Sequence, residues 1–246
     1  MKKNIFQSAQ LAKNNYCNFL DEKLNNIPYF YMFTEPETCG AHCEWDFGDA
    51  TGRYLDALLL CSEITGFDEE TDIAAKKLRS ALDWMISDED GLCYRPDGFE
   101  WVEYGANSFD QRSCMLGLAT WYKHYRDEAT RLQFERLIKG LYKMGIEIDD
   151  YFYIPVESYT DTLDKKIFEP REFDITTYRA DQCHYGGGVL IYPLMYWYHL
   201  TGSQEALALA GKLARFIVFH SGVFAEDGSF WMLGYGVDSD GHFHSR

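Results

Sequence analysis

Three pairs of helix-like segments recur along the chain. In each pair, a segment that is apolar on nearly every side is followed, after a short turn, by one that is apolar on a single face. The inner and outer members are 53–65 with 71–86, 113–125 with 130–144, and 189–200 with 204–220. A helix that is apolar all round is buried on all sides, whereas an amphipathic helix faces solvent. Repeated hairpins of this kind indicate a solenoid or a closed ring of helix pairs.

The connections between the pairs are very unequal in length. The turns within a pair are about five residues, whereas the connections between pairs cover roughly 87–106, 147–183 and 221–243. Loops longer than about 15 residues are usually functional or disordered, and these are too aromatic to be disordered. In a ring of hairpins they all emerge on the face where the inner helices begin. We therefore expect an all-α fold, an α/α toroid with an additional first helix at 5–23 and short β-hairpins in its long loops.

Composition narrows the classes of partner. The net charge of −16 would repel phosphate backbones and anionic lipid, which argues against nucleic acid and membrane partners. Seven cysteines without a regular framework are typical of reduced thiols in a cytoplasmic protein. The sequence has neither an apolar run of 18 residues nor the pattern of a signal peptide. We therefore expect a cytoplasmic protein, whose oligomeric state is left open.

Each inner segment begins with polar residues that an apolar core does not need. The acids at these starts are Asp49, Asp110 and Asp181. Hydrolysis of a glycosidic bond typically uses two carboxyl groups, one as acid and one as base or nucleophile, and a buried aromatic environment raises the pKa of the acid. We predict that these three residues are catalytic. Because Asp is also favoured as a helix N-cap, capping by Asp49 and Asp110 is the structural alternative.

Other residues near the same helix starts are predicted to bind the substrate. Trp45, Trp101 and Tyr104 would supply apolar walls for the faces of sugars. Arg53 and Arg112 would orient carboxylates or bind acidic sugar groups, and pairing with core acids is their structural alternative. The full predicted binding set is Glu44, Trp45, Asp46, Arg53, Trp101, Tyr104, Arg112, His184, His242 and His244.

One short segment carries side chains that can bind metals. It contains Cys39, His42, Cys43 and Glu44, but this spacing is not a usual structural zinc pattern. The segment Gly186–Gly188 is not followed by the Lys and Ser or Thr of a phosphate-binding loop. We predict neither a metal nor a cofactor.

The segment HCEWDFGDATGRYLDALLLCSEITG at 42–66, together with the alternation of inner and outer helices, resembles the six-hairpin glycosidase superfamily. The likeness is closest to the β-L-arabinofuranosidase-type glycoside hydrolases. The resemblance implies an (α/α)6 toroid and a carbohydrate substrate, although a fold alone does not settle the chemistry. The zinc-bound cysteine nucleophile of that family has no matching cluster in this sequence, so its mechanism is not carried over.

A complete toroid of this superfamily has twelve helices, and the sequence indicates seven. We expect residues 1–246 to be a single domain that forms the N-terminal part of a longer toroid. The function predicted from all these features is that of a carbohydrate-active enzyme, a glycoside hydrolase that uses inner-helix carboxylates. Two alternatives stay open: a sugar epimerase or isomerase that moves protons with His184, His242 or His244, and a non-catalytic helical-repeat scaffold that binds glycan or protein.

Overall fold

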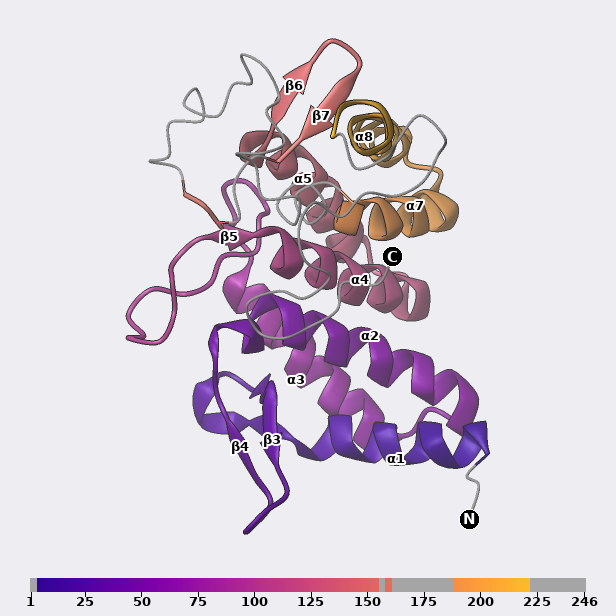
Figure 1. Cartoon of the computed structure of the whole chain (residues 1–246). Coiled ribbons are helices and arrows are strands. Elements are labelled where there is room, and N and C mark those ends of the chain that lie inside the picture. The colour runs from indigo at the N-terminus through magenta and orange to yellow at the C-terminus, as the bar shows by residue number, and fades with distance from the viewer. Residues whose placement is uncertain (1–3, 155–157, 161–187, 222–246) are drawn as a thin grey trace. The chain divides into compact units, whose positions relative to one another are not determined.

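The computed structural model describes residues 4–154, 158–160 and 188–221. The chain divides into two compact units, 1–141 and 142–246. The α-helices of the described residues are α1 (Ile5–Asn18), α2 (Gly48–Thr65), α3 (Glu69–Met85), α4 (Ser108–Tyr125), α5 (Glu128–Met144), α7 (Val189–Thr201) and α8 (Gln204–Arg215) (Figure 1). The three predicted hairpins are therefore present as α2–α3, α4–α5 and α7–α8.

The inner helices of the first unit begin one turn earlier than the apolar pattern predicts. The expected starts are residues 53 and 113, whereas α2 starts at Gly48 and α4 at Ser108. These added turns consist mainly of small and polar residues, which give no apolar periodicity. Asn107 caps α4 by accepting a hydrogen bond from the N–H of Phe109 at 2.8 Å.

Two other helices end before their expected limits. The first helix, expected over 5–23, ends at Asn18, and the chain continues into the short strand β1 (Leu20–Asp21). The last outer helix, expected over 204–220, is regular only to Arg215 and continues as a π-helix over Phe216–His220. The apolar periodicity thus located the helices correctly but did not mark where their regular geometry stops.

The three helical hairpins share a positive φ at the residue that follows the inner helix. The residue after the inner helix is Gly66 (φ 94°), Arg126 (φ 55°) or Gly202 (φ 75°). A positive φ at this position is the usual end of a helix, and glycine adopts it without steric cost. Arg126 is the one of these three residues that carries a side chain there, and its guanidinium lies over the Tyr122 ring at 5.4 Å.

Replacing Arg126 with glycine is expected to stabilise the protein. The left-handed conformation costs an L-residue about 1–2 kcal/mol, and loss of the exposed cation–π contact removes about 0.5 kcal/mol. We therefore expect the free energy of unfolding to rise by about 0.5–1 kcal/mol, measured by urea denaturation. A lower stability of Arg126→Gly would mean that the Tyr122 contact outweighs the backbone strain.

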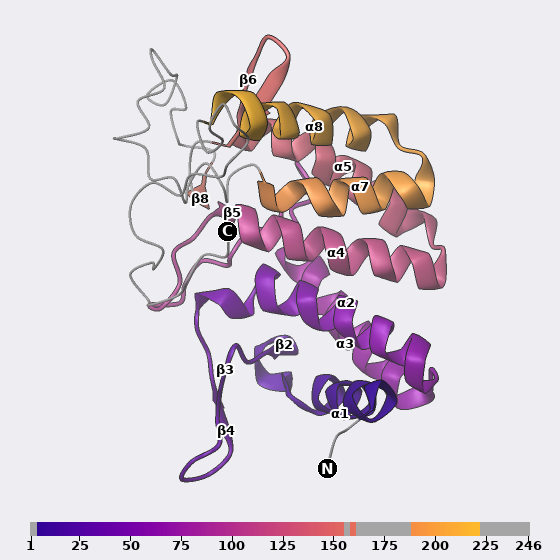
Figure 2. The same cartoon turned by 45° about the vertical axis from the view of Figure 1, so that its right-hand side comes forward.

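Helix α2 lies at the centre of the first unit. It packs against α1, α3 and α4, and Figures 1 and 2 show α4 on one side of α2 with α1 on the other. In α4 only His124 is exposed, whereas α3 exposes a polar face that includes Lys76 and Asp83. The inner role predicted for α4 is therefore confirmed, whereas α2 is no more buried than its outer partner α3, since it exposes residues such as Leu60 and Ile64.

The two inner helices of this unit touch through glycine. A Cβ atom placed on Gly52 would lie 2.1 Å from the carbonyl oxygen of Ser113 and 2.6 Å from the backbone nitrogen of Cys114. Gly117 of α4 lies against the same turn, since its Cβ would be 3.0 Å from the carbonyl oxygen of Gly52. The backbones of α2 and α4 can approach this closely only because neither of these positions carries a side chain.

The strands of the described residues are short. Those at 106–107, 146–148, 151–153 and 158–159 lie in long connections, as predicted, whereas those within 20–41 lie between α1 and α2, where none was predicted. The full set is β1, β2 (Ile27–Pro28), β3 (Tyr31–Phe33), β4 (Cys39–Ala41), β5 (Ala106–Asn107), β6 (Ile146–Ile148), β7 (Tyr151–Tyr153) and β8 (Ser158–Tyr159). The pairs β1–β2, β3–β4 and β6–β7 are antiparallel. In segment 86–105 the expected hairpin is reduced to two isolated bridges, Ile86 with Cys93 and Arg95 with Gly105.

The second unit contains the α7–α8 hairpin and the β6–β7 hairpin. Tyr153 of β7 and Phe216 are both buried, and their rings stack at 4.8 Å. Lys212 and Arg215 of α8 form ion pairs with Glu147 and Asp150 at 2.5 and 3.0 Å. Among the helices of the described ranges, none has the length and apolarity needed to cross a bilayer.

Candidate active site

The candidate site lies where α2 and α4 begin, in the first unit. The connection 86–105 and the β3–β4 hairpin emerge at this same end (Figures 1 and 2). Helix N-termini present unpaired N–H groups and a positive dipole end, which favour anionic side chains and ligands. The acids predicted from the sequence at residues 49 and 110 both lie in these first turns.

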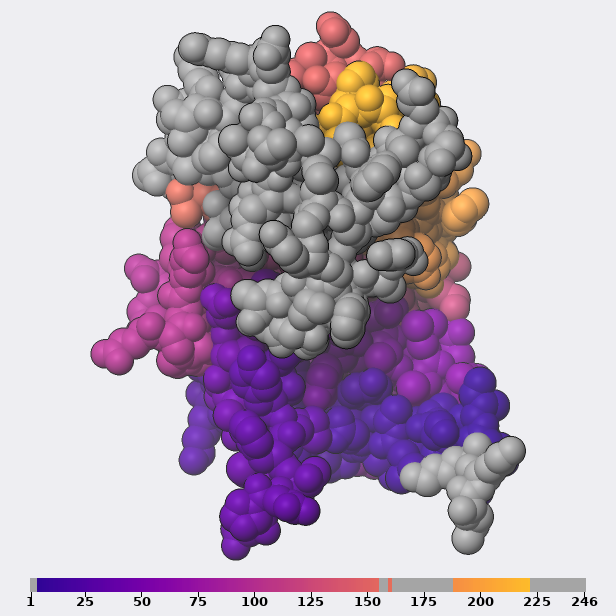
Figure 3. Space-filling model, viewed as in Figure 1, coloured from indigo at the N-terminus to yellow at the C-terminus, as the bar shows by residue number. Residues whose placement is uncertain are grey.

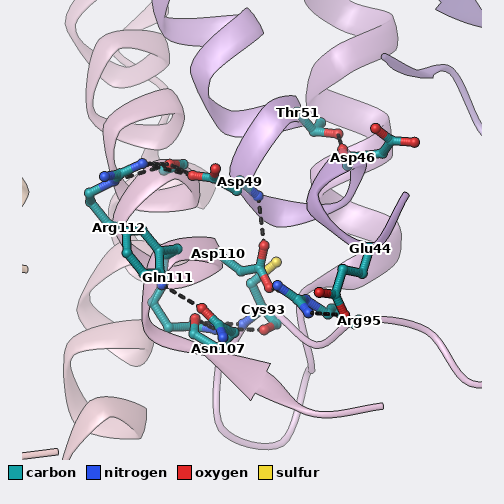
Figure 4. Close-up of polar contacts among 12 residues, drawn as sticks. Glu44, Asp46, Asp49, Thr51, Cys93, Arg95, Asn107, Asp110, Gln111 and Arg112 are labelled. Atoms are coloured by element: carbon teal, nitrogen blue, oxygen red, sulfur yellow. Dashed lines mark hydrogen bonds and ion pairs between the residues drawn. The ribbon is translucent and has the colours of Figure 1, made fainter. Parts of the chain in front are cut away.

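Asp110 joins the two helices and the connection between the pairs (Figure 4). Its Oδ1 accepts a hydrogen bond from the backbone N–H of Asp49 at 2.8 Å, and its Oδ2 accepts one from Nε of Arg95 at 2.7 Å. The carboxyl is wholly buried. The N-cap residues of α2 and α4 are Phe47 and Asn107, so neither acid caps its own helix. Asp110 instead satisfies an amide of the first turn of the neighbouring helix.

Burial raises the pKa of Asp110 to about 6. The nearby carboxylate of Asp49 acts in the same direction, while Arg95 and the Asp49 amide oppose the shift. Burial outweighs the ion pair because the carboxylate has lost its water on every side. A carboxyl of this kind keeps its proton closer to neutral pH than an exposed aspartic acid does.

This raised pKa predicts a pH dependence of stability. From about pH 4 to about pH 6 the folded protein holds a proton on Asp110 that the unfolded chain releases, so the contribution of this group to the free energy of unfolding falls as the pH rises. Asp110→Asn does not titrate. The stability of the wild type minus that of the variant is therefore expected to decrease across this window and then level off. A difference that grows with pH would show that the Arg95 ion pair outweighs burial.

Asp49 is the second buried acid, with an exposed fraction of 2%. Its Oδ1 accepts hydrogen bonds from Nη2 of Arg112 at 2.8 Å, from Nε of Arg53 at 3.0 Å and from the Ser113 hydroxyl. Nη2 of Arg53 also lies 2.8 Å from Oδ2. The sequence left open whether the two arginines pair with acids, and the structure confirms that both pair with Asp49.

Glu44 is the carboxylate of this group that solvent reaches most readily. Its side chain is 36% exposed, and its Oε2 lies 3.0 Å from Nη1 of Arg95. The guanidinium of Arg95 lies over the ring of Trp45 at 4.5 Å, and Trp45 meets Phe109 edge-on at 5.8 Å. Arg95 thus connects the buried Asp110 to Glu44 and Trp45.

Gln111 fixes the connection that carries Arg95. Its Oε1 accepts a hydrogen bond from the N–H of Cys93 at 2.8 Å, and its Nε2 donates to the carbonyl oxygen of Cys93 at 2.6 Å. Both bonds are buried. The position of Arg95, two residues further on, is therefore set by α4.

Asp46 belongs to a separate cluster at the root of the β3–β4 hairpin. Its wholly buried carboxylate accepts hydrogen bonds from the N–H of Phe30 and, at 2.8 Å, from the N–H of Cys43. Nδ1 of His42 lies 2.6 Å from its Oδ2, and Nε2 of His42 lies 3.1 Å from Oδ2 of Asp21. The contacts of Asp46 therefore hold the two legs of the hairpin together.

The two aromatic residues predicted in the connection are partly exposed. Trp101 is 40% exposed and stacks on Phe47 at 5.5 Å and on His42 at 6.0 Å. Tyr104 is 47% exposed and stacks on Tyr94 at 5.8 Å. Both keep an exposed aromatic surface that a ligand can contact.

The structure therefore brings part of the predicted set together. One polar network contains Glu44, Asp49, Arg53, Asp110 and Arg112, and Trp45 packs against it. Asp181, His184, His242 and His244 lie outside the described residues. In the ranges that the structure describes, no group of His, Cys, Asp and Glu side chains is arranged to hold a metal ion.

Sequence reasoning missed Arg95, Ser113 and the role of His42. Arg95 is a single charge in a loop, and no periodicity marks it. Its importance comes from Asp110, 15 residues away in the chain and 2.7 Å away in space.

Comparison with solved structures identifies the architecture. The chain is similar to a glycoside hydrolase family 76 mannosidase from Bacteroides thetaiotaomicron, with a TM-score of 0.61 and 10% identity over 92% of this chain and 56% of that one. It is also similar to an α-mannanase of the same family and organism, with a TM-score of 0.51 and 15% identity over 84% of this chain and 53% of that one. The predicted α/α fold of helical hairpins is confirmed.

The comparisons extend no further than the fold. The chain spans little more than half the length of each of these two structures. No protein-family model and no curated protein matches the sequence. The finer likeness to β-L-arabinofuranosidase-type enzymes and the continuation of the domain past residue 246 stay predictions.

Proposed function

We propose that the protein is a glycoside hydrolase. The observation that carries the proposal is the pair of buried acids at the starts of α2 and α4, in a fold whose similar solved structures are named a mannosidase and an α-mannanase. Buried acids beside exposed aromatic rings suit a substrate that is uncharged and has flat apolar faces. The proposed substrate is a neutral glycan, and α-mannosides are the first candidates.

Asp49, Asp110 and Asp181 are the proposed catalytic carboxylates. The raised pKa of Asp110, about 6, supports the role of an acid that keeps its proton up to about pH 6, well above the range of an exposed aspartic acid. Asp49, which accepts hydrogen bonds from Arg53 and Arg112, is the proposed base or nucleophile. Glu44, which is partly exposed and paired with Arg95, is added as the carboxylate that a ligand entering from solvent meets first.

The remaining predicted residues form the proposed binding surface. Trp45, Trp101 and Tyr104 would stack against sugar rings, while Arg53 and Arg112 would fix the position of the Asp49 carboxylate. Asp46 would act indirectly, by fixing the hairpin beside the site. His184, His242 and His244 are kept as proposed ligand contacts on the sequence argument alone.

The test is a substrate screen with the purified protein. Soluble α-mannan, arabinan and a mixed β-glucan are incubated with it, together with an aryl α-mannoside and an aryl β-L-arabinofuranoside, and new reducing ends or released phenol are measured. We expect hydrolysis of at least one of these substrates, with the α-mannosides first. A folded protein that releases nothing from any of them would refute the proposal as stated.

A further inference from the structure

The β3–β4 hairpin carries an aromatic surface that the proposed catalytic group does not use. Figures 1 and 3 show the hairpin projecting from the helices of the first unit at the end where α2 begins. Its strands pair Tyr31 with Ala41, Met32 with Gly40 and Phe33 with Cys39. Residues paired in this way point to the same face of a two-stranded sheet, and successive residues point to opposite faces.

One face of the hairpin is turned toward the body of the unit. A Cβ on Gly40 would lie 2.4 Å from the ring of Tyr29, which therefore packs directly on this glycine. The sulfur of Met32 lies 3.9 Å from the hydroxyl of Tyr54 on α2. The opposite face, formed by Tyr31, Phe33, Cys39 and Ala41, is called the hairpin platform below.

The hairpin platform presents two aromatic rings to solvent. Tyr31 and Phe33 are each 49% exposed, and the residues that face them across the strands are small. Two residues of a strand span about 7 Å. A ligand that covers both rings is therefore longer than a single sugar.

The platform is fixed in place at its root. The carboxylate of Asp46 accepts hydrogen bonds from the N–H of Phe30, just before β3, and from that of Cys43, just after β4. Rings held on a fixed support lose little freedom when a ligand binds. The same short segment leads into Glu44, Trp45 and the start of α2, so the platform is continuous in the chain with the candidate site.

Charge and size decide between possible occupants. The turn between the strands carries Glu35 and Glu37, and the whole chain has a net charge of −16, so an anionic ligand would be repelled. The surface that two rings on a three-residue strand can bury is far smaller than the roughly 800 Å² that each partner buries in a stable protein interface. A neutral chain of sugars, whose apolar ring faces stack on aromatic side chains, fits both limits.

We propose that the hairpin platform is an accessory binding surface for a neutral polysaccharide, which makes the protein selective for polymeric over short glycosides. This inference rests on the proposed function for its link to hydrolysis. Binding itself can be measured without turnover. The two proposals can therefore fail separately.

The experiment compares wild type with Tyr31→Ser/Phe33→Ser. Phe6→Ser is the matched control, because Phe6 is 50% exposed but lies on α1. Retardation in native gels containing soluble α-mannan or arabinan measures binding. The KM for the polymer measures its use as a substrate, and the rate of hydrolysis of an aryl glycoside measures the candidate active site alone. We expect the double variant to bind the polymer about tenfold more weakly, with KM raised to match. The aryl glycoside should be hydrolysed at an unchanged rate, and circular dichroism should show an unchanged melting temperature.

Three results would overturn the inference. In the first, neither the α-mannan gel nor the arabinan gel retards the wild type. In the second, the double variant is retarded as strongly as the wild type, and in the third, Phe6→Ser loses as much affinity as the double variant does. Size-exclusion chromatography adds a further check: a wild-type dimer that the double variant turns into a monomer would identify a second copy of the chain as the occupant. Retardation of the wild type without hydrolysis of any substrate would refute the proposed function and leave the binding surface standing.

Discussion

Replacing Gly52 with alanine is expected to lower the free energy of unfolding by about 3 kcal/mol or more. The new Cβ would lie 2.1 Å from the carbonyl oxygen of Ser113 and 2.6 Å from the backbone nitrogen of Cys114. Both contacts are with backbone, which cannot rotate away as a side chain can. Overpacking of a core typically costs about 1–3 kcal/mol, and here α2 and α4 must separate along their whole contact.

Gly211→Ala is the matched control. Gly211 lies inside α8, and no atom of the described residues is within 4 Å of its added Cβ. Alanine is favoured over glycine in a helix by about 1 kcal/mol, so this variant should be slightly more stable than wild type. Urea denaturation measures both variants. A Gly52→Ala protein as stable as wild type would show that the two inner helices are not in backbone contact.

Replacing Arg95 with methionine is expected to cost about 3–5 kcal/mol, the usual range when one partner of a buried ion pair is removed. Arg95 is 4% exposed, and the change removes its bond to Asp110, its ion pair with Glu44 and its stacking on Trp45. Asp110 would then be buried without a counter-charge, so its pKa should rise further. Chemical denaturation at pH 7 measures the loss.

A double-mutant cycle separates the ion pair from simple packing. In Arg95→Met/Asp110→Asn neither charge is present, so part of the loss should be recovered, with a coupling of about 1 kcal/mol or more. Arg131→Met, which removes an exposed pair with Glu128, is the control and should leave the unfolding curve unchanged. Strictly additive effects of the Arg95 and Asp110 changes would contradict the network.

The sequence predicted the helices well because burial imposes a period that can be counted. The amphipathic pattern of α3, with Ala74, Leu78 and Leu82 on one stripe, corresponds to a buried face in the structure. The first turn of α2 was missed because Gly48 and Gly52 lie in close contact with α4, and close contact at glycine leaves no apolar pattern in the sequence. The β3–β4 hairpin was missed because strands of three residues are too short for alternation to be recognised.

The candidate site was predictable in part. Asp49 and Asp110 stand out because charged residues at the starts of apolar helices usually have an ion-pair or hydrogen-bond partner or a functional role. Their partners could be named only partly, since Arg112 lies 63 residues from Asp49 in the chain. Arg95 and Ser113 were not predicted, because which residues meet across helices depends on packing that one sequence does not display.

The most direct test of the central claim is hydrolysis of α-mannan and an aryl α-mannoside by wild type, Asp110→Asn and Asp56→Asn under conditions where all three are folded. Asp56 lies two turns along α2 from Asp49 and accepts a hydrogen bond from Thr120, so it controls for loss of a carboxylate between the same two helices. Because Arg95 keeps its ion pair with Glu44 after the change, Asp110→Asn should remain within about 1–2 kcal/mol of wild-type stability. The account predicts turnover by wild type and Asp56→Asn and none by Asp110→Asn. Unimpaired turnover by Asp110→Asn would remove Asp110 from the catalytic group, and no release of sugar by the folded wild type would contradict the account.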